Sequence, residues 1–447
     1  MESDTTTTAL RPLGHAEKYS TTRSHLGIYL NVGLTARYKR PVGVAVKPAL
    51  FRALSRLIWK HPIVSAVPLA VDTTCPHFVR LPSITLSKVV TFIEDDDGSK
   101  SSDGREYLDH VLEEQHNRPF EDQTLPFWRI CVLECSKTPA YFTLVFIFHH
   151  SLMDTQSALY VHEELENFMS QSSRCDPDDT IDTPSAALLP PLEDLHTLTV
   201  SQEFLETQAA NPEPLPDSWT AAPQSTPVRT RFSSLWLSTA ETAALAAISK
   251  KEQTTVTAAL QTLIASSIFS VLPSAYRTLQ ADCAVSLRRF LPHAVTATSL
   301  GCYVSSTSMA YGRMASFNWG EARRTKTMID QELAKEASDM PVGYLSRIPN
   351  QHSWMLQKLG RRRTSAFELS NIGRVAPSKE LSFEIESILF SQSASACSAA
   401  IKASAVTGRD GRLVLGFTWQ EGIVEANMIE RLKQGLKREV ERLVLHE

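Results

Sequence analysis

The segment YFTLVFIFHHSLMD, residues 141–154, is the stretch around which we expect the whole chain to be organised. Its first part is almost continuously apolar and aromatic and lacks Gly and Pro, which predicts a buried strand rather than a surface helix. The strand leads into His149 and His150, a turn follows, and Asp154 stands four residues after His150. Residues 155–168 begin with polar side chains and continue with apolar periodicity, which predicts a helix. This combination of strand, histidine pair, turn and aspartate indicates an active site.

The residue types in this segment suit proton transfer. Packing fixes the rotamer of a histidine at the end of a buried strand, and an ordinary pKa of about 6.5 leaves its ring largely neutral and able to accept a proton. Asp154 is expected to hold the turn or to pair with a cation, so that it organises the site before it acts as a base.

Two other interpretations of the histidine pair stay open. Both rings could be satisfied core residues, as buried histidines often are. Together with Asp154 they could also be metal ligands, since histidine and carboxylate are ligand types. Adjacent residues of a strand point to opposite faces, however, so His149 and His150 would not easily reach one ion.

The run from His149 to Asp154 resembles the HHxxxDG signature of the chloramphenicol acetyltransferase superfamily. That superfamily includes non-ribosomal peptide condensation domains, plant BAHD acyltransferases and alcohol O-acetyltransferases. Thr155 stands where the signature has glycine. Other stretches resemble fungal alcohol O-acetyltransferases in the same order and extend the resemblance over most of the chain. They are RPLG at 11–14 with Glu17, Tyr19, Arg23 and residues 26–32, PFWRI at 126–130, VSLRRFLP at 285–292, LGCYV at 300–304 and LSNIG at 369–373.

The resemblance implies two chloramphenicol-acetyltransferase-like lobes that form a V, with the histidine loop and a substrate tunnel at their interface. The interleaving of strands and helices in each half separately favours the α/β class. The proline-rich residues 181–229 are expected to link an N-terminal lobe, residues 1–180, to a C-terminal lobe, residues 230–447. A short helix is expected inside the linker at 201–208.

The resemblance also implies roles for individual residues. His150 would take the proton from the acceptor hydroxyl, with His149 as the other histidine of the motif. Asp154 would pair with an arginine of the second half, and Arg288 is the matching candidate. Residues 284–290 read as a strand, so only one of Arg288 and the adjacent Arg289 should turn inward. Three further residues could line the tunnel or merely shape the local fold: Tyr19, Ser370 and Asn371.

These features indicate an acyl-CoA-dependent O-acyltransferase that transfers an acyl group, in the simplest case acetyl, to a hydroxyl of a small molecule or secondary metabolite. Direct transfer in a ternary complex is expected, because no GxSxG elbow indicates a serine acyl-enzyme. Acyl-CoA would be a co-substrate, with no bound cofactor and no metal. An acyl carrier protein as donor, as in condensation domains, is an alternative. A second alternative is a cyclase or binder that does not acylate, and Thr155 in place of glycine keeps it open. A catalytically silent interaction protein is the alternative that His150 and Asp154 make least expected.

Composition limits the remaining function classes. The chain has 447 residues and a net charge of −4, with both signs scattered, which does not indicate a nucleic-acid groove. Seven cysteines without CxxC spacing fit reduced thiols of the cytoplasm. The polar start of the chain does not resemble a signal peptide, and the apolar window 256–272 is interrupted by polar residues, which predicts a buried helix. A cytoplasmic monomer is expected, with contact at a membrane surface left open.

Five further patterns concern local structure in the second half. A capping box at Ser238 and Glu241 predicts a helix start, and a second helix is expected at 255–269 with Thr254 or Thr255 as its cap. Residues 413–419 read as a strand and 427–445 as an amphipathic helix that packs on the core. Arg361 to Arg363 form a basic run, either a solvated face or a contact for the phosphates of CoA.

Overall fold

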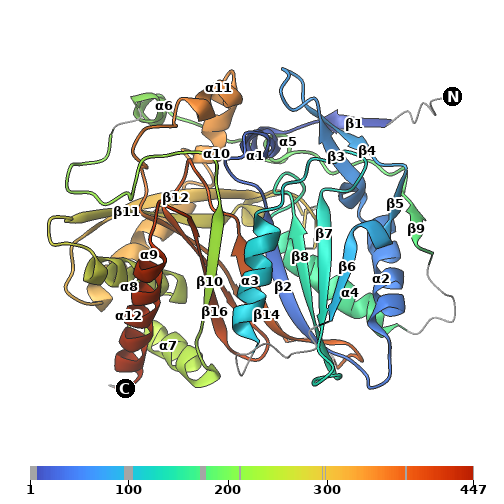
Figure 1. The fold of residues 1–447 in the computed structure, drawn as a ribbon. Helices are drawn as coiled ribbons and strands as arrows, with labels where there is room; N and C mark the ends of the chain where they lie inside the picture. The colour runs from blue at the N-terminus through green and yellow to red at the C-terminus, as the bar shows by residue number, and fades with distance from the viewer. Residues whose placement is uncertain are drawn as a thin grey trace.

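The computed structural model describes residues 8–94, 104–171, 178–210, 213–293, 295–296, 298–377 and 380–445. Two large sheets occupy the two halves of the molecule, with helices on their outer faces (Figure 1). The first is, in spatial order, β14 (Glu384–Gln392), β2 (Val32–Lys39), β8 (Tyr141–Phe148), β7 (Trp128–Glu134) and β6 (Val90–Glu94). The second is β10 (Thr230–Trp236), β16 (Leu413–Gln420), β15 (Ile401–Thr407), β13 (Phe367–Arg374), β11 (Thr278–Ser286) and β12 (Val304–Gly312).

Two small sheets and the helices complete the fold. The small sheets are β1 (Thr8–Pro12), β4 (His77–Arg80) and β3 (Ala66–Leu69), and β5 (Ser83–Thr85) with β9 (Thr180–Asp182). The α-helices are α1 (His15–His25), α2 (Val46–Lys60), α3 (Arg105–His116), α4 (Thr155–Ser170), α5 (Leu192–Leu195), α6 (Gln202–Ala210), α7 (Thr239–Lys251), α8 (Val256–Val271), α9 (Trp319–Leu333), α10 (Pro341–Tyr344), α11 (Gln351–Leu356) and α12 (Ala426–Leu445). The 3-10 helices are η1 (Pro62–Ser65), η2 (Leu86–Lys88), η3 (Arg288–Phe290) and η4 (Leu345–Arg347).

Strand β8 lies at the centre of the first sheet, as the apolar run predicted. It pairs antiparallel with β2 on one side and with β7 on the other, and its residues from Leu144 onward are buried. Helix α3 contacts this sheet through β2 and β8, and α4 contacts it through β2. The strand ends at Phe148, so both histidines lie just beyond it, and the N–H of His149 still donates to the carbonyl oxygen of Phe127 at 2.9 Å.

The first sheet takes one strand from the second half of the chain. Strand β14 pairs antiparallel with β2, with Leu389 opposite Thr35. The division into lobes at 1–180 and 230–447 stays a prediction. Residues 384–392 lie in the expected C-terminal lobe, but their backbone hydrogen bonds place them in the sheet of the first half. This pairing ties the two halves together one strand away from β8.

The helices of the second half follow their sequence signals. Ser238 and Glu241 form the predicted capping box of α7, and Thr255 caps α8 by accepting from the N–H of Ala258. The apolar stripe of α12 is fully buried and the helix packs against α8 and α7. Members of the stripe are Ile429, Leu432, Leu436 and Val440.

The basic run at 361–363 holds the segment that joins the halves. The Arg362 guanidinium donates to the carbonyl oxygens of Pro214, at 2.9 Å, and Ser218, at 2.7 Å. Arg363 is 1 % exposed and donates to the carbonyl of Ala222 and to Oε1 of Gln420. Neither side chain is a solvated surface cation. The linker also contains α6, close to the short helix that its sequence predicted.

The strand expected at 284–290 was wrong in its second half. Strand β11 pairs with β12 only as far as Ser286, opposite Val304. Leu287 then adopts a helical backbone conformation and η3 follows, so Arg288 lies in a turn. The apolar periodicity did not reveal this end, because Leu287 remains buried after the ladder stops.

Within the residues that the structure describes, no single helix is long and apolar enough to cross a membrane. The pair α7 and α8 would pass by length and composition, but it is bent by 104°. Most of α8 is buried against other parts of the protein, as the polar interruptions of its sequence predicted.

Candidate active site

His150 lines a cavity of about 450 Å³ whose wall comes from both halves of the chain. Its Nδ1 lies 3.1 Å from the carbonyl oxygen of Met153. A carbonyl oxygen only accepts, so this contact assigns the proton of the neutral ring to Nδ1 and leaves a lone pair on Nε2. Among the described residues, none hydrogen bonds to Nε2. The ring is therefore held from behind, with its basic nitrogen available.

The electrostatic surroundings keep the His150 ring neutral. Burial and the nearby Arg23 guanidinium lower the pKa of His150 to about 4, and the carboxylate of Asp154 opposes them. Near pH 7 the imidazole is thus in the form that accepts a proton. The ring of Tyr29 lies beside it, with the two ring centroids 6.2 Å apart.

His149 points into the protein instead of the cavity. It is 2 % exposed, and its ring centroid lies 5.5 Å from that of Phe127. Its Nδ1 accepts the backbone N–H of Ser151 at 3.1 Å and lies 2.7 Å from the Ser151 hydroxyl. Burial lowers the pKa of His149 to about 3. One histidine of the pair is thus a satisfied core residue and the other faces the cavity.

Asp154 is fully engaged as an organiser. Its Oδ1 caps α4 by accepting the N–H of Ser157 at 2.9 Å and the Ser157 hydroxyl at 3.1 Å. Its Oδ2 accepts from the Arg288 guanidinium and from the N–H of Tyr303, the latter at 3.1 Å. With both oxygens occupied and 1 % of its side chain exposed, this carboxylate fixes the turn after β8 and is not placed to take a proton from a substrate.

Arg288 comes from the second half and completes this arrangement. Besides Asp154, it donates to the Ser157 hydroxyl at 2.8 Å and to the carbonyl of Ser299 at 3.1 Å. Its guanidinium carbon also lies 5.0 Å from the centroid of the Tyr303 ring. Arg289 is exposed. The η3 turn, not strand alternation, directs Arg288 inward.

The three residues expected at a tunnel all line the cavity. Tyr19 extends from α1, and Ser370 and Asn371 belong to β13. The Asn371 amide donates to the Thr257 hydroxyl at 3.0 Å, and its carbonyl accepts the N–H of Gly373 at 2.9 Å. Gly373 has φ +83, which favours glycine. Asn371 therefore lines the cavity and shapes the turn at once.

Thr155 replaces the glycine of the signature without backbone strain. It is the first residue of α4 and does not have a positive φ. An ordinary side chain fits this position, and Thr155 also lines the cavity. The departure from the signature therefore changes the shape of the cavity wall and leaves the turn intact.

Several residues of the cavity wall were not singled out as site residues from the sequence. Arg23, Tyr29 and Cys302 stood in the quoted motifs without a role, Lys358 only precedes the basic run at 361–363, and Glu368 carried no signal. Cys302 Sγ lies 3.8 Å from His150 Nδ1. The wall is assembled from segments far apart in the chain, so no local spacing could have grouped these residues.

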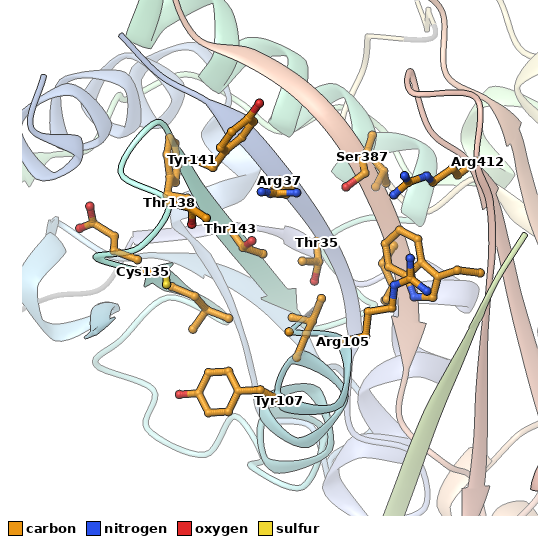
Figure 2. A pocket seen from close by; sticks show the side chains of 18 of the residues that line it. Thr35, Arg37, Arg105, Tyr107, Cys135, Thr138, Tyr141, Thr143, Ser387 and Arg412 are labelled. Atoms are coloured by element: carbon orange, nitrogen blue, oxygen red, sulfur yellow. The ribbon is translucent and has the colours of Figure 1, made fainter. Parts of the chain in front are cut away.

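A second cavity, of about 500 Å³, is lined by β2, β8 and β14 toward the ends of these strands that lie away from His150 (Figure 2). Tyr141 and Thr143 at the start of β8 line it, whereas the histidines follow the end of that strand. Arg37 and Ser387 line it from β2 and β14. The predicted site residues do not line it. Among the residues the structure describes, no group of three or more His, Cys, Asp or Glu side chains is arranged to hold a metal ion.

The fold is that of chloramphenicol-acetyltransferase-like acyltransferases and condensation domains. The trichothecene 15-O-acetyltransferase of Fusarium sporotrichioides superposes with a TM-score of 0.71 at 13 % identity, over 97 % of this chain and 94 % of that one. The first condensation domain of the calcium-dependent antibiotic synthetase superposes with a TM-score of 0.65 at 11 % identity, over 98 % and 97 % of the two chains. At these identities the likeness shows the fold.

Sequence comparison identifies the family within this class. The alcohol acetyltransferase family model matches residues 12–434, so the chain belongs to the alcohol acetyltransferase family and is a transferase. It is 32 % identical to the probable alcohol acetyltransferase crmB of Aspergillus fumigatus, over 95 % of this chain and 97 % of that protein. It is 24 % identical to the probable alcohol acetyltransferase FCK4 of Fusarium pseudograminearum, over 96 % and 94 %. The expected resemblance to fungal alcohol acetyltransferases is confirmed.

Proposed function

We propose that this acyltransferase moves an acyl group, in the simplest case acetyl from acetyl-CoA, to the hydroxyl of a small molecule, with His150 as the general base. The observation that carries the proposal is the neutral His150 ring, held through Nδ1 by Met153 with Nε2 unoccupied at a cavity. An alcohol is a weak nucleophile until a base removes its proton during attack, and a positioned imidazole contributes about 10²–10⁴-fold.

The transfer needs two proton movements. The acceptor hydroxyl gives its proton to His150 Nε2 while its oxygen attacks the thioester carbonyl, which forms a tetrahedral oxyanion. The oxyanion then collapses to the ester, the carbon–sulfur bond breaks, and the CoA thiolate takes the proton from the imidazolium. His150 returns to its neutral form, and an acyl-enzyme is not required.

Asp154 acts in this mechanism by position. Its oxygens hold Ser157, Tyr303 and Arg288, so it fixes the turn that carries His150 against the second half. Its negative charge also favours the imidazolium that forms during attack, since it raises the pKa of His150 against the effects of burial and Arg23.

Thiol release from acetyl-CoA in the presence of a panel of alcohols tests the proposal. Alcohol-dependent release by the wild type should fall about 10²–10⁴-fold in His150→Ala, the share that general base catalysis supplies. His110→Ala is the matched control, because the His110 side chain is 64 % exposed on α3, and should behave as the wild type.

Two results would change the proposal. Undiminished alcohol-dependent release by a folded His150→Ala would remove His150 as the base. If none of the alcohols causes thiol release from acetyl-CoA, and an acetylated carrier protein does give the ester, the donor is carrier-bound and not CoA. The condensation-domain fold makes that donor the second candidate.

A further inference from the structure

A chain of contacts among two cations and three aromatic rings, called the ladder below, runs along the cavity wall away from His150. The Arg23 guanidinium carbon lies 4.5 Å from the ring centroid of Tyr29 and 4.1 Å from that of Tyr19. The Tyr19 ring is 6.2 Å from that of Trp354, and Lys358 Nζ lies 3.5 Å from the Trp354 ring. All five side chains line the cavity.

Arg23 has no carboxylate or other hydrogen-bond partner within the described parts of the chain. Its Nε is buried without a hydrogen bond, and its contacts are the two tyrosine faces. Arginine is always charged and presents a planar set of donors that matches a carboxylate. A guanidinium kept between two rings at a cavity, with its donors unused, is prepared for an anion.

Lys358 repeats the pattern at the other end of the ladder. Its ammonium group rests on Trp354, and the described residues contain no carboxylate within ion-pair distance of it. Burial, together with Arg23 and Arg361, lowers the pKa of Lys358 to about 8. It thus remains largely charged near pH 7, at a cost in free energy that a bound anion would offset.

Two other cations of the cavity region, Lys402 and Arg288, are paired with carboxylates. Glu368 and Lys402 form an ion pair at 2.9 Å, and Asp154 pairs with Arg288. The carboxyl group of Asp282 accepts from the Ser308 hydroxyl and has no cation within ion-pair distance among the described residues, but burial raises its pKa, which favours its neutral form. The cations of the cavity without an ion-pair partner are therefore Arg23 and Lys358, which the rings of Tyr19 and Trp354 connect.

We propose that the acceptor alcohol carries a carboxylate, which Arg23 binds with both of its terminal nitrogens and Lys358 supports by charge. This inference rests on the proposed function and names its substrate class, a hydroxy acid. The rings of Tyr19 and Trp354 would contact the apolar body of the acceptor.

The position of Arg23 favours the acceptor over the phosphates of CoA as the source of the anion. One tyrosine ring, that of Tyr29, separates Arg23 from His150. A carboxylate on Arg23 and a hydroxyl on His150 can belong to one small molecule. The phosphates of CoA are separated from the thioester by the whole pantetheine arm, so they would lie farther from His150.

Binding of two fluorescent probes of similar shape tests the inference without turnover. Anilinonaphthalene sulfonate is an anion, and N-phenylnaphthylamine is its neutral counterpart. Arg23→Gln should weaken the sulfonate about tenfold, the loss expected for one charge-assisted contact, and leave the neutral probe unchanged. Arg347→Gln, an exposed arginine at the end of η4, is the matched control. Equal sulfonate affinity in wild type and Arg23→Gln, or an equal loss for both probes, would overturn the inference.

Displacement of the bound sulfonate then identifies the source of the anion. Phenyllactate should displace it at lower concentration than its methyl ester, and Arg23→Gln should abolish this preference. If Arg23→Gln instead weakens displacement by CoA relative to pantetheine, the cations serve the donor phosphates and the hydroxy-acid inference is wrong. Because these readouts need no acyl transfer, they stand even if the thiol-release assay overturns the proposed function.

Discussion

Asp154 and Arg288 lie 134 residues apart and form an ion pair in which their side chains are 1 % and 9 % exposed. The pair joins the turn after β8 to the turn after β11, and so connects the two halves beside His150. Removal of one partner from such a pair leaves a buried charge without compensation.

Arg288→Gln should therefore lower the free energy of unfolding by about 3–5 kcal/mol. It should also reduce kcat, because the turn that carries His150 loses its anchor. Urea unfolding and the thiol-release assay measure the two effects. The adjacent Arg289→Gln changes an exposed arginine and should stay within about 0.5 kcal/mol of the wild type. Similar unfolding curves for the two variants would contradict the structural role assigned to Arg288.

The two adjacent histidines should respond differently to substitution. His149→Ala removes a buried ring packed on Phe127 and Phe120, and should destabilise the protein by about 2–5 kcal/mol, as other large-to-small core changes do. His150→Ala should keep a melting temperature near that of the wild type while activity falls. Thermal unfolding and activity per folded molecule, measured on both variants, separate the roles. A stable His149→Ala with the activity loss expected of His150→Ala would reverse the assignment.

The pH dependence of activity should report the low pKa of His150. Since that pKa is about 4 and we propose that the neutral ring accepts the proton, kcat/KM should fall only as the pH decreases through about 4. Arg23 lowers this pKa by its positive charge, so Arg23→Gln should raise it and shift the acidic limb to higher pH. Arg347→Gln should leave the limb in place. A wild-type limb near the ordinary histidine value of about 6.5 would contradict this account.

The arginines that hold the linker should matter according to their burial. Arg363→Gln leaves the carbonyl of Ala222 without its buried donor, which should cost about 1–3 kcal/mol of stability. Arg229→Gln is the matched control, because its ion pair with Glu421 is exposed on both sides, and should cost about 0–1 kcal/mol. Chemical unfolding at constant pH measures both. Equal losses in the two variants would show that the linker contacts are energetically ordinary surface contacts.

The sequence by itself determined the elements whose signals are local. The apolar run predicted β8 because a strand buried on both faces needs little polar interruption, and capping chemistry located the starts of α7 and α8 because a side chain there meets a free N–H within three residues. The motif from His149 to Asp154 indicated the candidate active site and the family for the same reason: its residues are neighbours in the chain.

Only the tertiary structure decided which residues meet across the chain. Strand β14 joins the first sheet through pairing with β2, and the turn at η3 directs Arg288 to Asp154, although neither contact has a local sequence signal. His149 packs on Phe127 whereas His150 faces the cavity, a division of roles that depends on what surrounds each ring. The unmatched charges of Arg23 and Lys358 become visible only when distant segments enclose one cavity, since the presence or absence of a counter-ion depends on packing in space and not on spacing in the sequence.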